Sequence, residues 1–314
     1  DLGFDAEILA AFERLRYASD GAMIVGGSTG DGKSTTLIRS IQKLIEEKNN
    51  RVSVVTIEDP VEMRLDSPAI IQIPVSSAGD GDDRGEVYRR ALMHFSRINP
   101  DIGIISEMRD GHGARQVLQF VSSGHMCYTT IHTNNVNEIP FRLIGWGVAP
   151  AELARPGILK VMVQQKLVPH LCPACALEWD GQRGLPKYLL EASRAAKEQL
   201  RFRNVSGCAT CLSGFSGAGR IAWAGYERLV AVGEVIEPDE TYLAAIGRND
   251  GLAAVQHWRA PVSQGGMGGR TIGEKVYERV LAGHVDPDDG RDRGAGGAIL
   301  AAQAKAALPQ GGKR

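Results

Sequence analysis

The sequence predicts an α/β protein built around a mostly parallel β-sheet, and three features of the chain support this prediction. In the first half, short apolar runs alternate with amphipathic stretches of helical length. A glycine-rich turn links the first apolar run to a helix, and each polar motif described below follows or brackets a predicted strand. Strands separated by helices require right-handed crossovers, which give a sheet covered on both faces. The predicted strands cover residues 22–25, 52–57, 102–105 and 126–131, and the predicted helices cover residues 33–48, 85–96 and 113–121.

Length and composition define the class of protein. The 314 residues suffice for a main domain and one or two smaller units, and 43% hydrophobic with 23% charged residues is typical of a soluble globular chain. A net charge of −1 gives no basic signature, so we expect no nucleic-acid partner. No apolar run approaches the roughly 20 residues of a membrane-spanning helix, and no secretory signal is present. We therefore expect a protein of the cell interior, and the start at Asp1 rather than Met leads us to expect further sequence before it.

A phosphate-binding loop is predicted at residues 27–34, which fit the pattern G-x-x-x-x-G-K-[ST] between a strand and a helix. The glycines allow backbone N–H groups to surround phosphates, and the helix that follows directs its positive end at them. We expect Lys33 to reach the β- and γ-phosphates of ATP and the Ser34 hydroxyl to bind Mg²⁺. Asp31 is unusual beside a polyphosphate, so its side chain is expected to point outward. The expected nucleotide contacts are Gly27, Ser28, Thr29, Gly30, Asp31, Gly32, Lys33, Ser34 and Thr35.

Acidic residues follow the next two predicted strands. Glu58, Asp59 and Glu62 come after the second strand, where a carboxylate can orient water in line with the γ-phosphate. A solvated acidic turn is the alternative, and the residues alone favour it. Glu107 closes the third strand, a position that suits a carboxylate near Mg²⁺, directly or through water.

Two histidines, His125 and His132, bracket the fourth predicted strand. His132 falls at the carboxyl end of that strand, where ligands bind in parallel sheets. A lone histidine is more often a packed or surface residue, so the pattern by itself assigns neither a role.

Four of the five cysteines form two Cys-x-x-Cys pairs, Cys172 with Cys175 and Cys208 with Cys211. In a chain without a secretion signal this spacing favours a tetrahedral metal site over disulfides. Zinc is the expected metal because all four ligands are sulfur, with an iron–sulfur cluster or unrelated cysteines as alternatives. Four thiolates leave no open position, so the site is expected to be structural. Cys127 lies in a predicted strand and is expected to be a buried hydrophobic residue.

The motifs, taken in order, resemble those of the type II secretion and type IV pilus assembly ATPases. The likeness covers residues 2–282 and rests on the phosphate loop and on the segments TIEDPVE, NPDIGIISEMRD and GHMCYTTIHTN, which match the family's aspartate, Walker B and histidine boxes. The segments QQKLVPHLCPAC and GRTIGEKVYERV are similar to its metal-site approach and its C-terminal helix. The chain departs from the family pattern at Asn99, at Ser106 and near Met93 and His94, which indicates a divergent member.

The resemblance implies a role for each matching residue. Glu62 takes the place of the catalytic base, supported by Glu58 and Asp59, and Glu107 takes the place of the Walker B glutamate. His132 is implied as the γ-phosphate sensor. The remaining implied nucleotide contacts are His125 and Arg109.

The resemblance also implies an architecture, a RecA-like P-loop core followed by a small zinc-binding element with four cysteine ligands and a C-terminal helical region. Residues 169–219 change to a Cys-, Gly- and Pro-rich texture with a helix at 186–200, helices are expected at 227–281, and the tail is expected to be poorly ordered apart from a short helix near 298–307. The expected parts are an ATPase core (1–168), a zinc element (169–225), a helical subdomain (226–285) and the tail (286–314).

Family members are hexamers whose nucleotide sites lie between this domain and a preceding one that supplies arginines. The resemblance therefore implies a homo-hexamer in the cytoplasm, peripheral to the inner membrane, with a membrane platform protein as partner and only indirect membrane contact. A tetracysteine element is typical of the assembly and export branch. Without the preceding domain we expect the chain to bind ATP and Mg²⁺ but to hydrolyse ATP slowly, because such arginines accelerate phosphoryl transfer.

Other functions stay open at this point. A nucleic-acid translocase with a zinc ribbon is disfavoured because neither a basic stripe nor interleaved aromatic residues are present. A GTPase is disfavoured because no N-K-x-D motif occurs. An adaptor that binds ATP without hydrolysing it requires Glu62 or Glu107 to be misplaced. The machine served, whether for pilus assembly, secretion or conjugation, is left open.

Overall fold

The computed structural model describes residues 2–58, 60–75, 95, 98–213 and 222–295. The chain forms two compact units, each built from segments that are not consecutive. We call residues 5–165 and 234–269 the phosphate-loop unit, and residues 1–4, 166–233 and 270–314 the cysteine unit. The four consecutive parts expected from the sequence stay a prediction, since strands β6 and β9 each contribute residues to both units.

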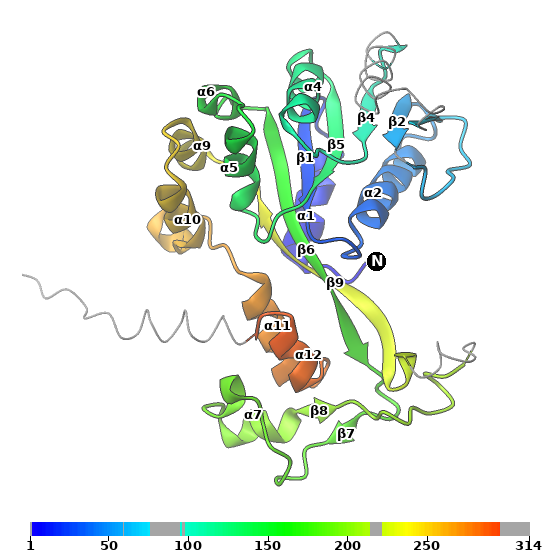
Figure 1. Cartoon of the computed structure of the whole chain (residues 1–314), viewed down its shortest axis with the longest axis vertical. Helices are drawn as coiled ribbons and strands as arrows, with labels where there is room; N and C mark the ends of the chain where they lie inside the picture. Colours follow the sequence, from blue (N-terminus) through cyan, green and yellow to red (C-terminus); the bar gives the residue numbers. More distant parts are fainter. Residues whose placement is uncertain (1, 59, 76–94, 96–97, 214–221, 296–314) are drawn as a thin grey trace, which may run out of the picture. The chain divides into compact units, whose positions relative to one another are not determined.

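A seven-stranded sheet has the order β3-β2-β4-β5-β1-β6-β9 (Figure 1). The neighbours β3–β2, β2–β4, β4–β5, β5–β1 and β1–β6 pair in parallel, which confirms the predicted mostly parallel sheet. Every residue of β1, β2, β4 and β5 is buried, as expected for strands covered on both faces. The strands are β1 (Gly21–Gly26), β2 (Val54–Glu58), β3 (Ile70–Pro74), β4 (Ile102–Ile105), β5 (Met126–Ile131), β6 (Leu159–Leu171) and β9 (Tyr226–Ile236).

Three helices of the phosphate-loop unit, α4, α9 and α10, begin at an aspartate whose side chain accepts hydrogen bonds from backbone N–H groups of the first turn. Asp110 accepts hydrogen bonds from the N–H groups of His112 and Gly113 at the start of α4, and Asp239 caps α9 through Tyr242. The largest core of this unit includes residues of β1, β2, β4, β5, α4, α5, α9 and α10. The helices are α1 (Ala6–Leu15), α2 (Lys33–Glu47), α4 (Gly111–Ser122), α5 (Glu138–Gly145), α6 (Pro150–Leu153), α9 (Glu240–Gly247) and α10 (Gly251–Arg259), with a 3₁₀ turn η2 (Val262–Gln264).

Most predicted elements of the first half are confirmed with small shifts of their ends. The predicted helix at residues 85–96 lies outside the described residues except for Phe95, whose ring is buried against Phe120 at a centroid distance of 4.5 Å. The helical region expected from residue 227 is wrong at its start. Residues 226–236 form β9, whose consecutive apolar residues 229–232 include two valines that favour a strand, and helices resume only at α9.

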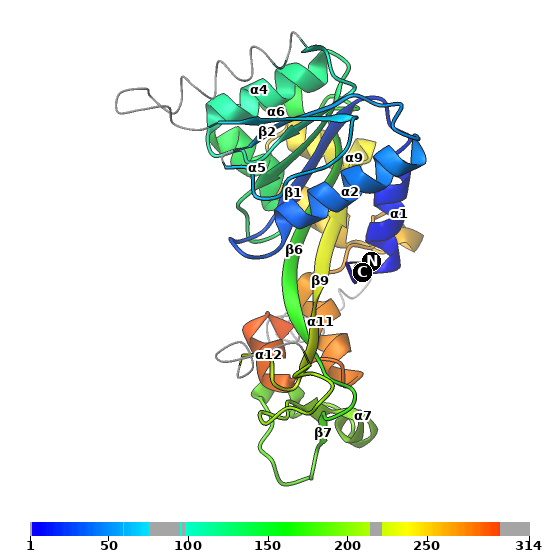
Figure 2. The same ribbon diagram turned by 90° about the vertical axis from the view of Figure 1, so that its right-hand side faces the viewer.

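The cysteine unit has its own hydrophobic core, to which Val168, Tyr188, Phe202, Val232 and Val276 contribute. The helix expected at residues 186–200 is wrong, because Ser193 accepts a hydrogen bond from Ala196 N–H and starts a separate helix there. The tail expected from residue 286 contains a capped helix, while the helix expected near residues 298–307 lies outside the described residues. The further elements of this unit are η1 (Lys187–Leu189), α7 (Arg194–Gln199), α11 (Ile272–Leu281), α12 (Pro287–Asp292) and the antiparallel pair β7 (Leu177–Glu178) and β8 (Arg201–Phe202). Figure 2 labels α7, α11, α12 and β7.

Within the part of the chain that the structure describes, no helix combines the length and apolar character needed to cross a membrane.

Candidate nucleotide site and cysteine cluster

The phosphate loop joins the end of β1 to the start of α2. Gly30 and Gly32 have φ angles of 85° and 80°, a left-handed backbone that glycine adopts without strain. Lys33 begins α2, and its Nζ donates to the carbonyl oxygens of Gly27 (2.9 Å) and Ser28 (3.0 Å). The ammonium group therefore lies along the inner edge of the loop. Of the other expected contacts, Ser28, Thr29 and Thr35 are exposed and Ser34 is half-buried.

Asp31 does not point outward, so this expectation is wrong. The residue is 6% exposed, and its Oδ2 accepts a hydrogen bond of 2.7 Å from the Ser28 N–H. Its backbone carbonyl accepts a second bond of 2.6 Å from Gln165 Nε2 on β6. The partner on β6 is Gln165, which lies far from the loop in sequence. The sequence of the loop alone therefore does not reveal this contact.

Glu107 and His132 meet at the loop, as the strand pairing requires. β5 is parallel to β1 with Ile131 opposite Gly26, so the residue after each strand lies beside the other. His132 Nδ1 lies 3.1 Å from the Gly27 carbonyl oxygen, and His132 Nε2 lies 2.5 Å from Glu107 Oε1. The second oxygen of Glu107 accepts a hydrogen bond of 2.7 Å from Arg109 Nε. The structure thus brings together a lysine, a carboxylate and a histidine that are far apart in sequence.

The charge of Lys33 is set by two opposing effects. Burial lowers the pKa of Lys33 from its ordinary value, and the nearby carboxylates of Glu107, Asp31 and Glu62 raise it in part. The contribution of Glu62 shows that this exposed residue lies within electrostatic range of the loop lysine.

Glu58 and His125 are held by other partners. Glu58 ends β2, is buried, and accepts hydrogen bonds from Thr56 Oγ1 (2.6 Å) and Gln72 Nε2 (2.9 Å). His125 precedes β5, stacks on Phe120 and lies at the opposite end of that strand from His132, about 23 Å away by strand rise. The structure does not bring His125 to the phosphate loop, so its implied nucleotide contact is not supported here. Asp59 lies outside the described residues.

Two adjacent glutamines on β6 position the site, and sequence reasoning missed them. Gln165 Nε2 holds the loop at Asp31, while its Oε1 accepts from Thr36 Oγ1 (2.8 Å) in α2. Gln164 forms a reciprocal pair with Thr133, which follows His132, with bonds of 2.7 and 2.8 Å. A Cβ on Gly26 would lie 2.2 Å from Thr133 Oγ1, so a glycine is required there. The available signal was two consecutive glutamines directly after the apolar residues 161–163.

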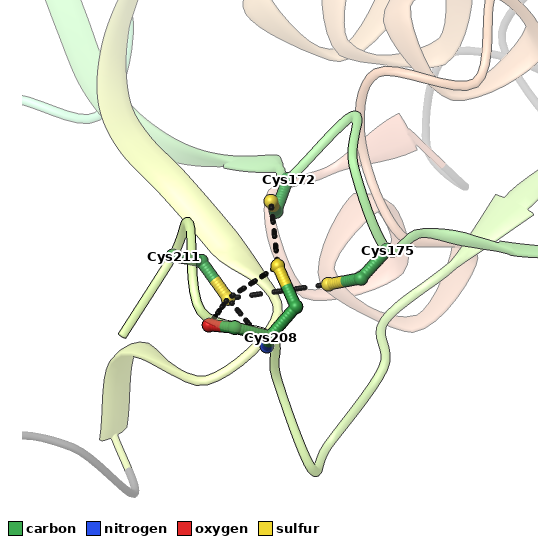
Figure 3. A group of neighbouring side chains, drawn as sticks. All are labelled: Cys172, Cys175, Cys208 and Cys211. Atoms are coloured by element: carbon green, nitrogen blue, oxygen red, sulfur yellow. Dashed lines mark hydrogen bonds between the residues drawn. The ribbon is translucent and has the colours of Figure 1, made fainter. Parts of the chain in front are cut away.

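The four paired cysteines gather in the cysteine unit with their sulfurs turned toward one another (Figure 3). The Sγ–Sγ distances are 3.9 Å for Cys172–Cys208, 3.9 Å for Cys175–Cys211 and 3.8 Å for Cys208–Cys211. A tetrahedron of zinc–sulfur bonds has edges of about 3.8 Å, whereas a disulfide requires about 2.05 Å. The cluster therefore fits a four-thiolate metal site.

Backbone N–H groups surround this cluster. The N–H groups of Cys208 and Gly225 lie 3.2 and 3.3 Å from Cys211 Sγ, as in the outer shell of a metal site. The Cys211 N–H lowers the pKa of Cys208 to about 6, whereas burial raises the pKa of Cys175 to about 12. A bound metal ion would therefore have to displace the proton of the Cys175 thiol.

An α/β sheet with a glycine-rich loop and a buried lysine at its carboxyl edge defines the phosphate-loop class of nucleotide-binding proteins. Within that class, the family described as type II/IV secretion system protein matches residues 1–265. The chain belongs to this family.

Known proteins resemble the chain over most of its length. It is 30% identical over 282 residues to the type II secretion system protein E of Klebsiella pneumoniae, covering 90% of this chain and 50% of that protein. It is 36% identical over 210 residues to the type IV pilus assembly ATPase TfpB of Acinetobacter baylyi, covering 67% of this chain and 34% of that protein. The fold is similar to that of the Legionella pneumophila ATPase DotB, with a TM-score of 0.61, 19% identity and coverage of 93% and 63%. The chain thus spans half or less of these two curated relatives.

Proposed function

We propose that this chain is the motor domain of a hexameric ATPase that drives pilus assembly, type II secretion or a related conjugation machine. The observation that supports it most directly is the meeting of Lys33, Glu107 and His132 at one end of the parallel sheet. Family membership and the relatives' names, which include secretion proteins and a pilus assembly ATPase, support the same function.

The described residues offer groups suited to several parts of ATP hydrolysis. Lys33 would neutralise charge on the β- and γ-phosphates, and Ser34, on the first turn of α2, would hold Mg²⁺ with help from Glu107. Bound Mg²⁺ would neutralise charge that develops on the phosphates. Glu62, exposed and within electrostatic range of Lys33, would orient the attacking water as the base.

His132 is suited to report the state of the γ-phosphate. Its two ring nitrogens face the Gly27 carbonyl and the Glu107 carboxylate, so the ring joins the loop to the carboxylate that would serve Mg²⁺. Loss of the γ-phosphate would alter both contacts of His132. A resulting shift of His132 would move the carboxyl end of β5, which it follows. Arg109 holds the other oxygen of Glu107 and belongs to the same network.

Assembly and location form the rest of the proposal. We infer a homo-hexamer in the cytoplasm, peripheral to the inner membrane and attached to a platform protein of the machine, with no nucleic-acid partner. Support comes from the family and from the near-neutral composition. The cysteine cluster would hold a structural zinc ion through Cys172, Cys175, Cys208 and Cys211.

The decisive experiment compares phosphate release by the wild-type protein and its Glu62→Gln variant in the complete polypeptide that carries this chain. We expect the variant to bind ATP and Mg²⁺ with unchanged affinity and to lose hydrolysis by about 100-fold or more, because general-base catalysis contributes that much. Glu46→Gln is the matched control, since Glu46 is exposed at the far end of α2.

Two outcomes would replace the proposal. Tight ATP binding without measurable hydrolysis by the wild-type protein would indicate a nucleotide-gated adaptor. Hydrolysis that increases strongly with single-stranded DNA would indicate a translocase.

A further inference from the structure

Asp31 places a carboxylate beneath the phosphate loop, an arrangement that ATP binding does not need. The side chain is almost fully buried, and the position of a Cβ on Gly27 would be 3.3 Å from Asp31 Cβ and 3.5 Å from its Oδ2. The carboxylate therefore packs against the start of the loop. In the structure it accepts the Ser28 N–H and closes a ring between residues 28 and 31.

The position of Asp31 is fixed from behind by β6. Gln165, which is fully buried, donates to the Asp31 carbonyl at 2.6 Å and accepts from Thr36 at 2.8 Å. Because both ends of this amide are occupied, the main chain at Asp31 cannot turn outward without leaving buried groups unpaired. The hydrogen bonds of Asp31 thus hold its carboxylate at a fixed position in the loop.

The negative charge of Asp31 interacts electrostatically with any ion bound in the loop. Asp31 contributes with Glu107 and Glu62 to the field at Lys33. Buried charges are screened less by salt than exposed ones, so the carboxylate opposes a bound polyphosphate at short range. A nucleotide that carries Mg²⁺ has two fewer negative charges than the free nucleotide and is opposed less.

We propose that Asp31 makes nucleotide binding at this loop depend on a divalent cation, because its charge penalises metal-free nucleotide more than the magnesium complex. The inference rests on the proposed function of the loop and adds a selection rule to it. Asp31 also stabilises the loop through the Ser28 hydrogen bond, so the same side chain shapes the loop and limits its affinity.

The test is isothermal titration of ATP into the full chain, once with Mg²⁺ and once with EDTA, for the wild type and Asp31→Asn. Asparagine retains an oxygen for the Ser28 N–H and removes only the charge. We expect Asp31→Asn to lower the dissociation constant of metal-free ATP about tenfold and that of the magnesium complex by a smaller factor. The dissociation constant of metal-free ATP divided by that of the magnesium complex should therefore fall at least about threefold. Asp31→Ser serves as a second variant and is expected to shift the ratio in the same direction.

Asp20→Asn is the matched control, because it also removes one negative charge but lies just before β1, at the opposite end of that strand. It should leave the ratio unchanged. If ATP binds and Lys33→Met abolishes binding, but both Asp31 variants keep the wild-type ratio, the inference is wrong and the proposed function stands. If neither the wild type nor any variant binds ATP, the proposed function fails and the inference fails with it.

Discussion

Lys33 is placed where its charge is costly for the folded chain. Burial lowers its pKa, and its ammonium group donates hydrogen bonds to the Gly27 and Ser28 carbonyl oxygens. Because the pKa of Lys33 is lower in the folded chain, the folded chain binds fewer protons there than the unfolded chain. The contribution of Lys33 to the free energy of unfolding therefore rises as the pH approaches 10.5, the ordinary pKa of a lysine. Such a cost is expected where a charge serves binding rather than folding.

Lys33→Met should therefore separate binding from stability. We expect it to weaken ATP binding by about 100-fold or more, since the phosphates lose their charge partner, without lowering the midpoint of thermal unfolding at pH 7. The stability difference between the variant and the wild type should shrink as the pH rises toward about 10. Lys48→Met, at the exposed end of α2, should change neither property. A Lys33→Met protein that unfolds well below the wild type would show that Lys33 is structural.

Strands β1 and β5 and helix α2 were predictable from the sequence, because apolar runs and the phosphate-loop pattern define them. β6 was not predicted, since Gln164 and Gln165 interrupt its apolar run. They are buried only because loop and helix groups from distant segments satisfy their amides. The burial of Asp31 was missed for the same reason, because it depends on β6. The chemical groups of the site could thus be predicted from short sequence motifs. The contacts that position the loop could not, because they come from β6, which is distant in sequence.

β6 should hold the phosphate loop mainly through Gln165. We expect Gln165→Ala to destabilise the phosphate-loop unit by about 2–4 kcal/mol, because it leaves the Asp31 carbonyl and the Thr36 hydroxyl buried without this partner. ATP affinity should fall as well, because the loop loses its fixed shape. Denaturant unfolding and nucleotide titration measure the two effects.

Lys160→Ala provides the control on the same strand. Lys160 pairs with Asp20 at 3.4 Å, with about a third or more of each side chain exposed, so its removal should cost less than about 1 kcal/mol. Equal losses for the two variants would mean that any polar change in β6 disturbs the strand, and the specific role of Gln165 would be wrong.

The two units have separate cores and separate ligand sites. One core collects residues of β1, β5, α4 and α9 in the phosphate-loop unit, and the other collects residues of α11, β8 and β9 in the cysteine unit. The sulfur cluster lies wholly in the second, and the loop with Lys33 lies wholly in the first. A ligand stabilises the part of a protein that folds to bind it, so each ligand should act on its own unit.

Calorimetry of the full chain should therefore show two transitions that respond to different ligands. Mg²⁺ and ATP at about 100 times the dissociation constant contribute about 2.7 kcal/mol, which should raise the transition of the phosphate-loop unit by about 5–10 °C. Removing zinc with a chelator, or replacing Cys208 by Ser, should lower the other transition by about 10 °C or more, because structural zinc sites are coupled to folding. Restoring zinc after chelation should restore that transition, and metal analysis should find about one zinc per chain in the untreated protein. A single transition that moves equally with nucleotide and with zinc would contradict this, because it would mean that the two units unfold together and that each ligand stabilises the whole chain.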